Sequence, residues 1–143
     1  MKVQELARQE QISADTIRHY VRIGLLQPGK ADNGYHIFSG GDQKRLRFIR
    51  QARDLGFTLD DIQKILHEAG RGSSPCPTVR QLIEPRLQEA RNRLQAMQAL
   101  VERMESAVAG WQAMPDCFPS GDHICHLIES CDAPVAAEEK SCE

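Results

Sequence analysis

The chain has 143 residues, of which 41% are hydrophobic and 27% charged, so it has the composition of one soluble globular domain or one small domain with an extension. Its net charge of −2 alone argues against nucleic-acid binding, but residues 1–70 carry a net +2 and residues 71–143 a net −4. No apolar run approaches the roughly 18 residues of a membrane span, and the N-terminus lacks a secretory signal, so we expect a cytoplasmic protein without a membrane partner.

Two short helices are predicted at the N-terminus. Apolar residues follow helical spacing over residues 3–7 and again over residues 17–21. Ser13 is a good N-cap for the second helix, and Gly24 is a good residue to end it. Two short helices separated by about three residues form the helix-turn-helix pattern.

A small β-hairpin is predicted next. Asp32-Asn33-Gly34 is a strong signal for a hairpin turn. Apolar residues flank this turn, as Leu25-Leu26 on one side and as residues 35–38 on the other. The hairpin would form a wing beside the two helices.

Two further helices follow this wing. Ser39 and Asp42 can cap a third helix that Gly56 ends, and Thr58 can cap a fourth. Their apolar residues have helical spacing: Leu46, Ile49 and Ala52 on the third helix, and Leu59, Ile62, Ile65 and Leu66 on the fourth. The third helix also carries a basic cluster suited to meeting phosphate, formed by Lys44, Arg45, Arg47, Arg50 and Arg53.

The most regular segment of the chain follows a loop rich in Gly, Ser and Pro. We place this hinge at residues 71–84 and a long helix at residues 85–112, with Pro85 at its start or at a bend. Its apolar positions alternate spacings of four and three: Ile83, Leu87, Ala90, Leu94, Met97, Val101, Met104, Val108 and Trp111. That period is typical of a coiled coil, and no other segment is long enough to cover it. The sequence therefore predicts a homodimer.

All five cysteines lie in the second half of the chain, at positions 76, 117, 125, 131 and 142. An odd set in a reducing cytoplasm favours metal binding or thiol chemistry over a disulfide framework. After the long helix we expect a loop with a short helical turn at residues 113–130. The acidic tail at residues 131–143 is expected to be disordered.

Four stretches of the first half carry a family resemblance: Asp15-Thr16-Ile17-Arg18-His19-Tyr20, Asn33-Gly34-Tyr35, Lys44-Arg45-Leu46-Arg47-Phe48-Ile49-Arg50 and Leu55-Gly56-Phe57-Thr58-Leu59. In order and spacing they resemble the MerR family, the mercury-resistance-type regulators, over residues 1–67. The long helix and the cysteine-bearing segment after it resemble the metal-sensing branch of that family. The resemblance implies a mainly α fold. A winged helix-turn-helix domain at residues 1–70 is followed by a long dimerisation helix, which forms an antiparallel coiled coil with the same helix of a second chain. A short C-terminal metal-binding loop follows this helix.

For the DNA-binding half, the resemblance implies a recognition helix in the major groove of double-stranded promoter DNA. The residues expected to contact DNA are Ser13, Thr16, Arg18, His19, Tyr20, Arg22, Tyr35, Arg47 and Arg50. The alternative is a solvated helix face, with Tyr20 packed on the core and the arginines simply exposed. His36 and Phe38 stand where the family often has Arg and Tyr, so the wing lacks one permanent positive charge.

For the cysteine-bearing half, an antiparallel coiled coil brings the start of one helix beside the end of its partner. Cys76 of one subunit would then approach Cys117 and Cys125 of the other. Three thiolates suit a soft or borderline divalent metal such as Zn, Cd, Pb or Hg, and His123 or His126 can supply a fourth ligand. Cys131 and Cys142 are expected to be spare thiols.

The resemblance implies a transcription activator of metal-resistance or efflux genes. It would distort the promoter spacer when metal binds, so that RNA polymerase engages the promoter. Two alternatives keep the same fold: a thiol-based redox or electrophile sensor, and a monovalent copper-type sensor, whose loop spacing resembles that of Cys117 and Cys125. A regulator of organic ligands is not expected, because the sequence shows no further domain that would enclose such a ligand. An enzyme is not expected, because no Ser/His/Asp set or carboxylate pair stands out.

Overall fold

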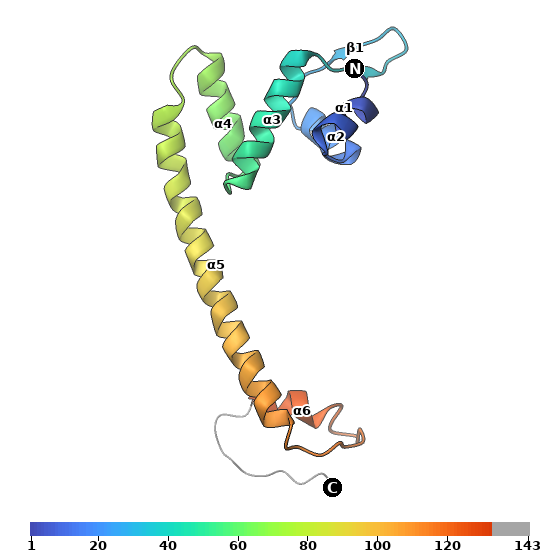
Figure 1. Cartoon of the computed structure of the whole chain (residues 1–143), viewed down its shortest axis with the longest axis vertical. Helices are drawn as coiled ribbons and strands as arrows, with labels where there is room; N and C mark the ends of the chain where they lie inside the picture. Colours follow the sequence, from blue (N-terminus) through green and yellow to red (C-terminus); the bar gives the residue numbers. More distant parts are fainter. Residues whose placement is uncertain (133–143) are drawn as a thin grey trace. The chain divides into compact units, whose positions relative to one another are not determined.

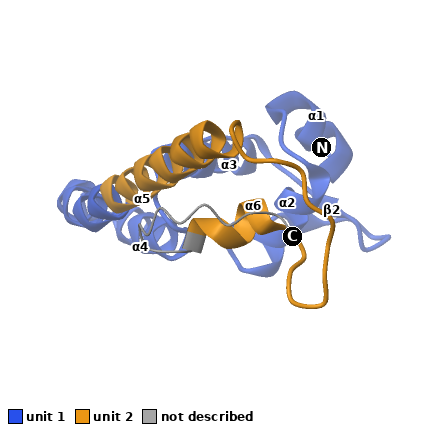
Figure 2. Cartoon of the chain, turned by 90° about the horizontal axis from the view of Figure 1, so that it is seen from below, with its two compact units in different colours: residues 1–89 blue, residues 90–143 orange. Residues whose placement is uncertain are grey.

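A computed structural model describes residues 1–132 of the chain. Its elements run in the order α1 (Val3–Glu10), α2 (Ala14–Arg22), β1 (Gly29–Lys30), β2 (His36–Ile37), α3 (Gly40–Asp54), α4 (Leu59–Gly70), α5 (Cys76–Trp111), α6 (His126–Glu129) and the 3-10 turn η1 (Ser130–Asp132) (Figure 1). They form two compact units, residues 1–89 and residues 90–143, and α5 contributes to both (Figure 2). The predicted mainly α fold is confirmed, with its helix-turn-helix, its wing and its long helix.

The turn between α1 and α2 is held by local backbone geometry. Gln11 ends α1 with a positive φ of 55°, and its N–H donates to Ala7 O. Ser13 then caps α2, because its side chain accepts a hydrogen bond from Thr16 N at 3.1 Å. Leu6 of α1 and Ile17 of α2 are fully buried, so the two helices share one core.

The wing is a two-stranded antiparallel hairpin in which Gly29 pairs with Ile37 and Lys30 with His36. Gly34 has a φ of 84° in the turn, a conformation that suits glycine. The N-terminus lies beside this hairpin (Figure 1), where the Met1 amino group donates to Phe38 O at 2.9 Å and Phe38 N donates to Met1 O at 2.8 Å.

Leu25 and Leu26 do not flank the hairpin as a strand, so that prediction is wrong. Both are only 1% exposed, whereas neighbouring residues of a half-buried strand alternate between two faces. Their N–H groups both donate to Tyr20 O and so satisfy the C-terminal end of α2. The pair belongs to the helix end and to the core.

Helices α3 and α4 begin with the predicted caps. Ser39 and Asp42 form a capping box at α3, and Thr58 and Asp61 form one at α4. Gly56, with a φ of 96°, lies in the turn between the two helices. Their inner faces complete the core, in which Leu46, Ile49, Ile62 and Ile65 are at most 2% exposed.

Helix α5 begins at Cys76, so residues 76–84, predicted as part of the hinge, are helical. Pro77 lies in the first turn of α5, where a proline costs no hydrogen bond. Val79 N donates to Pro75 O at 2.9 Å. Val79, Leu82 and Ile83 pack against the core of residues 1–89. This burial outweighs the loss of one backbone donor at Pro85, which lies inside the helix. Of the predicted hinge, residues 71–75 form a loop, and the prolines at 75 and 77 mark the start of the helix.

Beyond the residues that pack on the first unit, most apolar side chains of α5 are exposed among the described residues 1–132. Among the large apolar residues of the predicted repeat, Leu94 is 68%, Met97 58%, Val101 43%, Met104 55% and Val108 54% exposed. We call these five side chains the exposed stripe. No residue of α5 is buried.

The segment after α5 folds back onto the end of that helix. Trp111 Nε1 donates a hydrogen bond to Leu127 O at 2.9 Å, and the same carbonyl accepts one from Ser130 Oγ at 2.7 Å. The predicted disordered tail lies almost wholly outside the described residues. Within residues 1–132, no helix is long and apolar enough to cross a membrane.

Candidate functional site

The outer face of α2 carries the polar side chains predicted to contact DNA. Arg18, His19 and Arg22 are exposed, and Ser13 Oγ lies 2.7 Å from Thr16 Oγ1 at the helix start. Arg18 pairs with Asp15 at 2.9 Å, and both side chains are well exposed. Such a pair contributes little to stability and is easily exchanged for another anion.

Tyr20 differs from these residues because it is 9% exposed and belongs to the core. This position matches the alternative interpretation, in which Tyr20 supports α2 from behind. The exposed set on α2 is therefore Ser13, Arg18, His19 and Arg22, with Thr16 partly covered.

The tip of the wing presents a second exposed site. Tyr35 is 65% exposed, and Lys2 Nζ lies 5.8 Å from the centroid of its ring. Lys2 was not among the predicted residues, because its contact with Tyr35 joins residues far apart in the chain and no local sequence pattern indicates it. The wing thus regains a cation beside Tyr35. His36 lies further back, and its Nδ1 is buried without a hydrogen-bond partner among the described residues.

Arg47 and Arg50 have structural partners on α1. Arg47 Nε donates to both carboxylate oxygens of Glu10 at 3.0 Å, and Gln43 Nε2 donates to Glu10 Oε1 at 2.6 Å. Arg50 Nη1 donates to Glu10 O at 2.6 Å. The hydrogen bonds from Arg47 and Gln43 hold the pKa of Glu10, which is 3% exposed, below its ordinary value. Two of the five residues of the predicted basic cluster, Arg47 and Arg50, therefore join α3 to α1.

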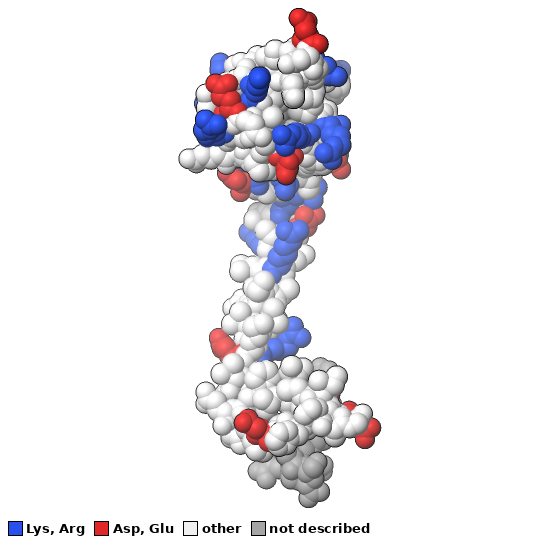
Figure 3. Space-filling model, turned by 90° about the vertical axis from the view of Figure 1, so that its right-hand side faces the viewer, with Lys and Arg blue, Asp and Glu red and all other residues white. Residues whose placement is uncertain are grey.

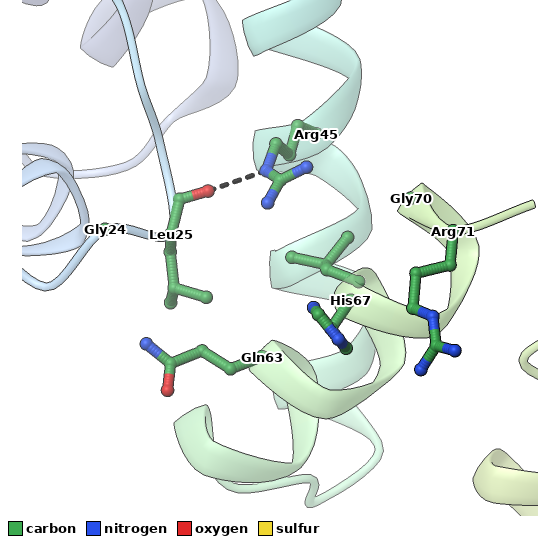
Figure 4. A pocket seen from close by; sticks show the side chains of 8 residues that line it. Gly24, Leu25, Arg45, Gln63, His67, Gly70 and Arg71 are labelled. Atoms are coloured by element: carbon green, nitrogen blue, oxygen red, sulfur yellow. Dashed lines mark hydrogen bonds between the residues drawn. The ribbon is translucent and has the colours of Figure 1, made fainter.

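Arg45 also has a structural role. Its Nε donates to Leu25 O at 2.7 Å, and the dashed line in Figure 4 marks this bond. Around it lies an open hollow of about 460 Å³, whose polar lining comes from Arg45, Gln63, His67 and Arg71. Gln63 Nε2 donates to Ile23 O at 3.1 Å, so two of these side chains fasten the end of α2 to α3 and α4.

Charge is unevenly spread over the surface. In the view of Figure 3, Lys and Arg side chains gather on residues 1–89 and along α5, whereas the C-terminal end shows Asp and Glu. This agrees with the net +2 of residues 1–70 and the net −4 of residues 71–143. Of the two halves of the sequence, residues 1–70 therefore have the charge better suited to binding a polyanion.

Cys76 is the first residue of α5. Its thiol is free and exposed, and its N–H donates to Ser74 Oγ at 3.4 Å.

The second cysteine-bearing segment follows α5. Cys125 occupies the N-cap position of α6 with a free, half-buried thiol, and His126 Nε2 lies 2.9 Å from Pro115 O. His123 Nδ1 lies 3.3 Å from Glu129 Oε2. Cys117 is disulfide-bonded in the structure, so only its reduced form offers a thiolate to a metal.

These donors are chemically suited to a borderline metal, because thiolate and imidazole both bind zinc and its heavier relatives. Within residues 1–132 of a single chain, no three His, Cys, Asp or Glu side chains come together to hold an ion. Cys131 Sγ donates to Leu127 O at 3.5 Å, a contact within the short helical segment after α5.

Comparisons with known proteins agree with this geometry. Residues 1–69 match the family model of the MerR HTH family regulatory protein, and residues 43–107 match the model described as MerR, DNA binding. The chain is 32% identical to the HTH-type transcriptional regulator ZntR of Escherichia coli K12, over 99% of both chains. It is 30% identical to the mercuric resistance operon regulatory protein of Bacillus cereus, covering 72% of this chain and 78% of that protein.

A solved structure supports the fold over most of the chain. The lead(II) complex of the transcription regulator PbrR691 from Ralstonia metallidurans has a TM-score of 0.66 to this chain. It covers 91% of this chain and 98% of its own, at 24% sequence identity. At this identity the likeness extends to the fold alone.

Proposed function

The chain belongs to the MerR family of helix-turn-helix transcription regulators, and on this basis we propose that it is a homodimeric, metal-responsive activator that binds promoter DNA. Its relatives named above are regulators rather than enzymes, as the sequence analysis expected. The effector is a divalent soft or borderline ion, namely Zn, Cd, Pb or Hg. The single observation that carries the metal is the free Cys76 at the first residue of α5, in a chain with further cysteines beyond the end of that helix.

In the proposed complex, α2 enters the major groove and the wing contacts the backbone. Ser13, Thr16, Arg18, His19 and Arg22 face the DNA, and Tyr35 with Lys2 meets a phosphate group. The exposure of these side chains supports this role. Arg47 and Arg50 act indirectly by joining α1 to α3, and Tyr20 supports α2 from the core. Each cation that neutralises a phosphate makes the affinity fall more steeply with salt.

The dimer is proposed from the exposed stripe. Five large apolar side chains along one helix face, each at least 43% exposed, would otherwise remain in water. Their spacings of three and four suit knobs-into-holes packing against the same helix of a second chain. An antiparallel arrangement places the start of one α5 at the end of the other.

This arrangement lets the metal ligands come from both chains. Cys76 of one subunit joins Cys117 and Cys125 of the other, with His123 or His126 as a further ligand. His126 Nε2 lies 2.9 Å from Pro115 O and His123 Nδ1 lies 3.3 Å from Glu129 Oε2, so each imidazole would bind the ion through its other ring nitrogen while it keeps this contact. Cys117 binds in its reduced form.

Coupling follows from the two places where these ligands lie. An ion shifts an equilibrium only if its affinity differs between the two states. Cys76 begins α5 directly after the loop from α4, so a bond to its thiol acts on the residues that join the DNA-reading helices to the dimer helix. The proposed output is a distorted promoter spacer that RNA polymerase can engage.

The test is a promoter-reporter metal panel with Cys76→Ser, Cys117→Ser and Cys125→Ser, using Cys131→Ser as the matched control. We expect the three ligand variants to lose the response to every metal and the control to keep it. A wild-type response in Cys76→Ser would contradict the ligand set shared between subunits.

A thiol-based redox sensor is the second candidate, and the disulfide at Cys117 is the observation that favours it. Peroxide added to the same reporter separates the two. Induction by peroxide and by no metal would replace the metal sensor with the redox sensor. Induction by metal under reducing conditions supports the first proposal.

A further inference from the structure

Arg86 makes a two-point contact between α5 and α4. Its Nε donates to Asp61 Oδ2 at 2.7 Å, and its Nη2 donates to Asp61 Oδ1 at 3.3 Å. The third nitrogen, Nη1, donates to Glu89 Oε1 at 2.8 Å. A guanidinium that meets a carboxylate with two parallel bonds fixes the relative orientation of the two groups as well as their distance.

Asp61 is an unusual partner because it is almost fully buried, at 2% exposed, and already caps α4. Thr58 N donates to Asp61 Oδ2 at 3.0 Å. Burial alone would raise the pKa of Asp61, but the hydrogen bonds from Arg86 and Thr58 outweigh it and hold that pKa below its ordinary value. One ionised carboxylate therefore serves the start of α4 and the side of α5 together.

The contact lies where the environment of α5 changes. Before Arg86, the apolar side chains Val79, Leu82 and Ile83 pack against the core of residues 1–89. After it, Leu87 is 49% exposed and Leu94 is 68% exposed. Apolar packing tolerates small rotations, whereas a bidentate ion pair between rigid helices does not. Arg86 thus fixes the orientation of the first turns of α5 against α4 within the first unit.

We propose that Arg86 is a positioning residue, which fixes the orientation of the DNA-reading unit on the dimer helix and so sets the separation of the two recognition helices. This rests on the proposed dimer and adds a residue that neither contacts DNA nor binds the metal. A symmetric dimer with two recognition helices reads two half-sites whose spacing matches the separation of those helices, so this separation is a determinant of operator choice. In this proposal, the two-point contact between Arg86 and Asp61 maintains the separation of the two recognition helices.

The test measures the distance between the two DNA-reading units in the dimer without DNA or metal. All five cysteines are replaced by Ser, and Asp32→Cys at the exposed wing turn carries one spin label in each chain. Dipolar spectroscopy then reports the distribution of distances between the two labels. We compare this background with Arg86→Gln, with Arg86→Lys, which keeps the charge but loses the fork, and with Glu89→Gln, which removes only the exposed partner.

We expect Arg86→Gln to broaden the distance distribution by at least about twofold, because the charged two-point contact with Asp61 is lost. Arg86→Lys should give an intermediate width, and Glu89→Gln should match the background. Circular dichroism confirms that each variant is folded, and Arg86→Lys keeps the test valid if Arg86→Gln unfolds. A folded Arg86→Lys with the width of the background would overturn the proposal. Absence of any dipolar signal in the background would instead contradict the dimer, on which both proposals depend.

Discussion

Residues 1–89 and the part of α5 beyond them contain the same kinds of apolar side chain, but these are buried in the first region and exposed in the second. In the first unit, Leu6, Ile17, Leu46, Ile49 and Ile62 are fully buried, and Glu10 and Asp61 are paired inside. In the second, Leu94, Met97 and Met104 are more than half exposed on a regular helix. The first unit buries most of its apolar side chains in its own core. The long helix is regular, but its apolar side chains are left exposed. We infer that stability is local in one region and depends on a second chain in the other.

The largest expected effect comes from two leucines with nearly equal exposure. Leu94 on the exposed stripe is 68% exposed, and Leu55 after α3 is 70% exposed. We expect Leu94→Asp to weaken the dimer by at least about a thousandfold, because each dimer would bury two carboxylates. Leu55→Asp is the control and should leave the dimer intact. Sedimentation velocity at micromolar concentration measures both, and equal effects would contradict the distinction between the two regions.

A smaller effect tests the first unit. Leu46 is fully buried, so Leu46→Ala should lower the free energy of unfolding by about 2–5 kcal/mol, through lost burial and a residual cavity. Leu55→Ala serves again as the exposed control and should stay within about 0.5 kcal/mol of the parent. Urea titration followed by circular dichroism gives both values. If Leu46→Ala unfolds no more easily than the control, the core of residues 1–89 is not the source of its stability.

The smallest effect concerns the ion pair between Glu10 and Arg47. Because the folded chain holds the pKa of Glu10 below its ordinary value, the stability it contributes is present at neutral pH and is lost as pH falls through the folded pKa. Glu10→Gln should therefore cost about 1.5–3 kcal/mol at pH 7. The cost should become smaller as the pH falls into the acid range, because the carboxyl of the parent then also becomes protonated.

Urea midpoints measured at several pH values between neutral and acid check this prediction. The matched control is Glu5→Gln, on the exposed face of the same helix. A Glu10→Gln variant that loses the same stability at every pH would show that the carboxylate contributes through packing and not through its charge.

Local chemistry accounts for the parts of the fold that the sequence predicted correctly. The capping boxes at Ser39 and Thr58 and the positive φ of Gly56 depend on residues within four positions of each other. The apolar repeat of α5 likewise follows from spacing alone. Such features need no knowledge of the rest of the chain.

The missed features depend on contacts between distant residues. Cys76 begins a helix because Val79, Leu82 and Ile83 find a core to pack on, which composition around Pro75 cannot reveal. The partners of Glu10 and Asp61 come from α3 and α5, so a charge run gives no sign of them. Lys2 approaches Tyr35 only because the N-terminus pairs with Phe38.

The indole of Trp111 has one more consequence. It is the single tryptophan of the chain, and its Nε1 donates to Leu127 O, in the turn that begins beside Cys125 and His126. The near-ultraviolet emission of the protein, excited at the red edge, is thus the emission of one side chain fastened to the cysteine-bearing segment. A ligand that separates α6 from the end of α5 should shift the emission maximum of Trp111 and change its intensity. Trp111 is therefore an intrinsic fluorescent probe of the cysteine-bearing segment.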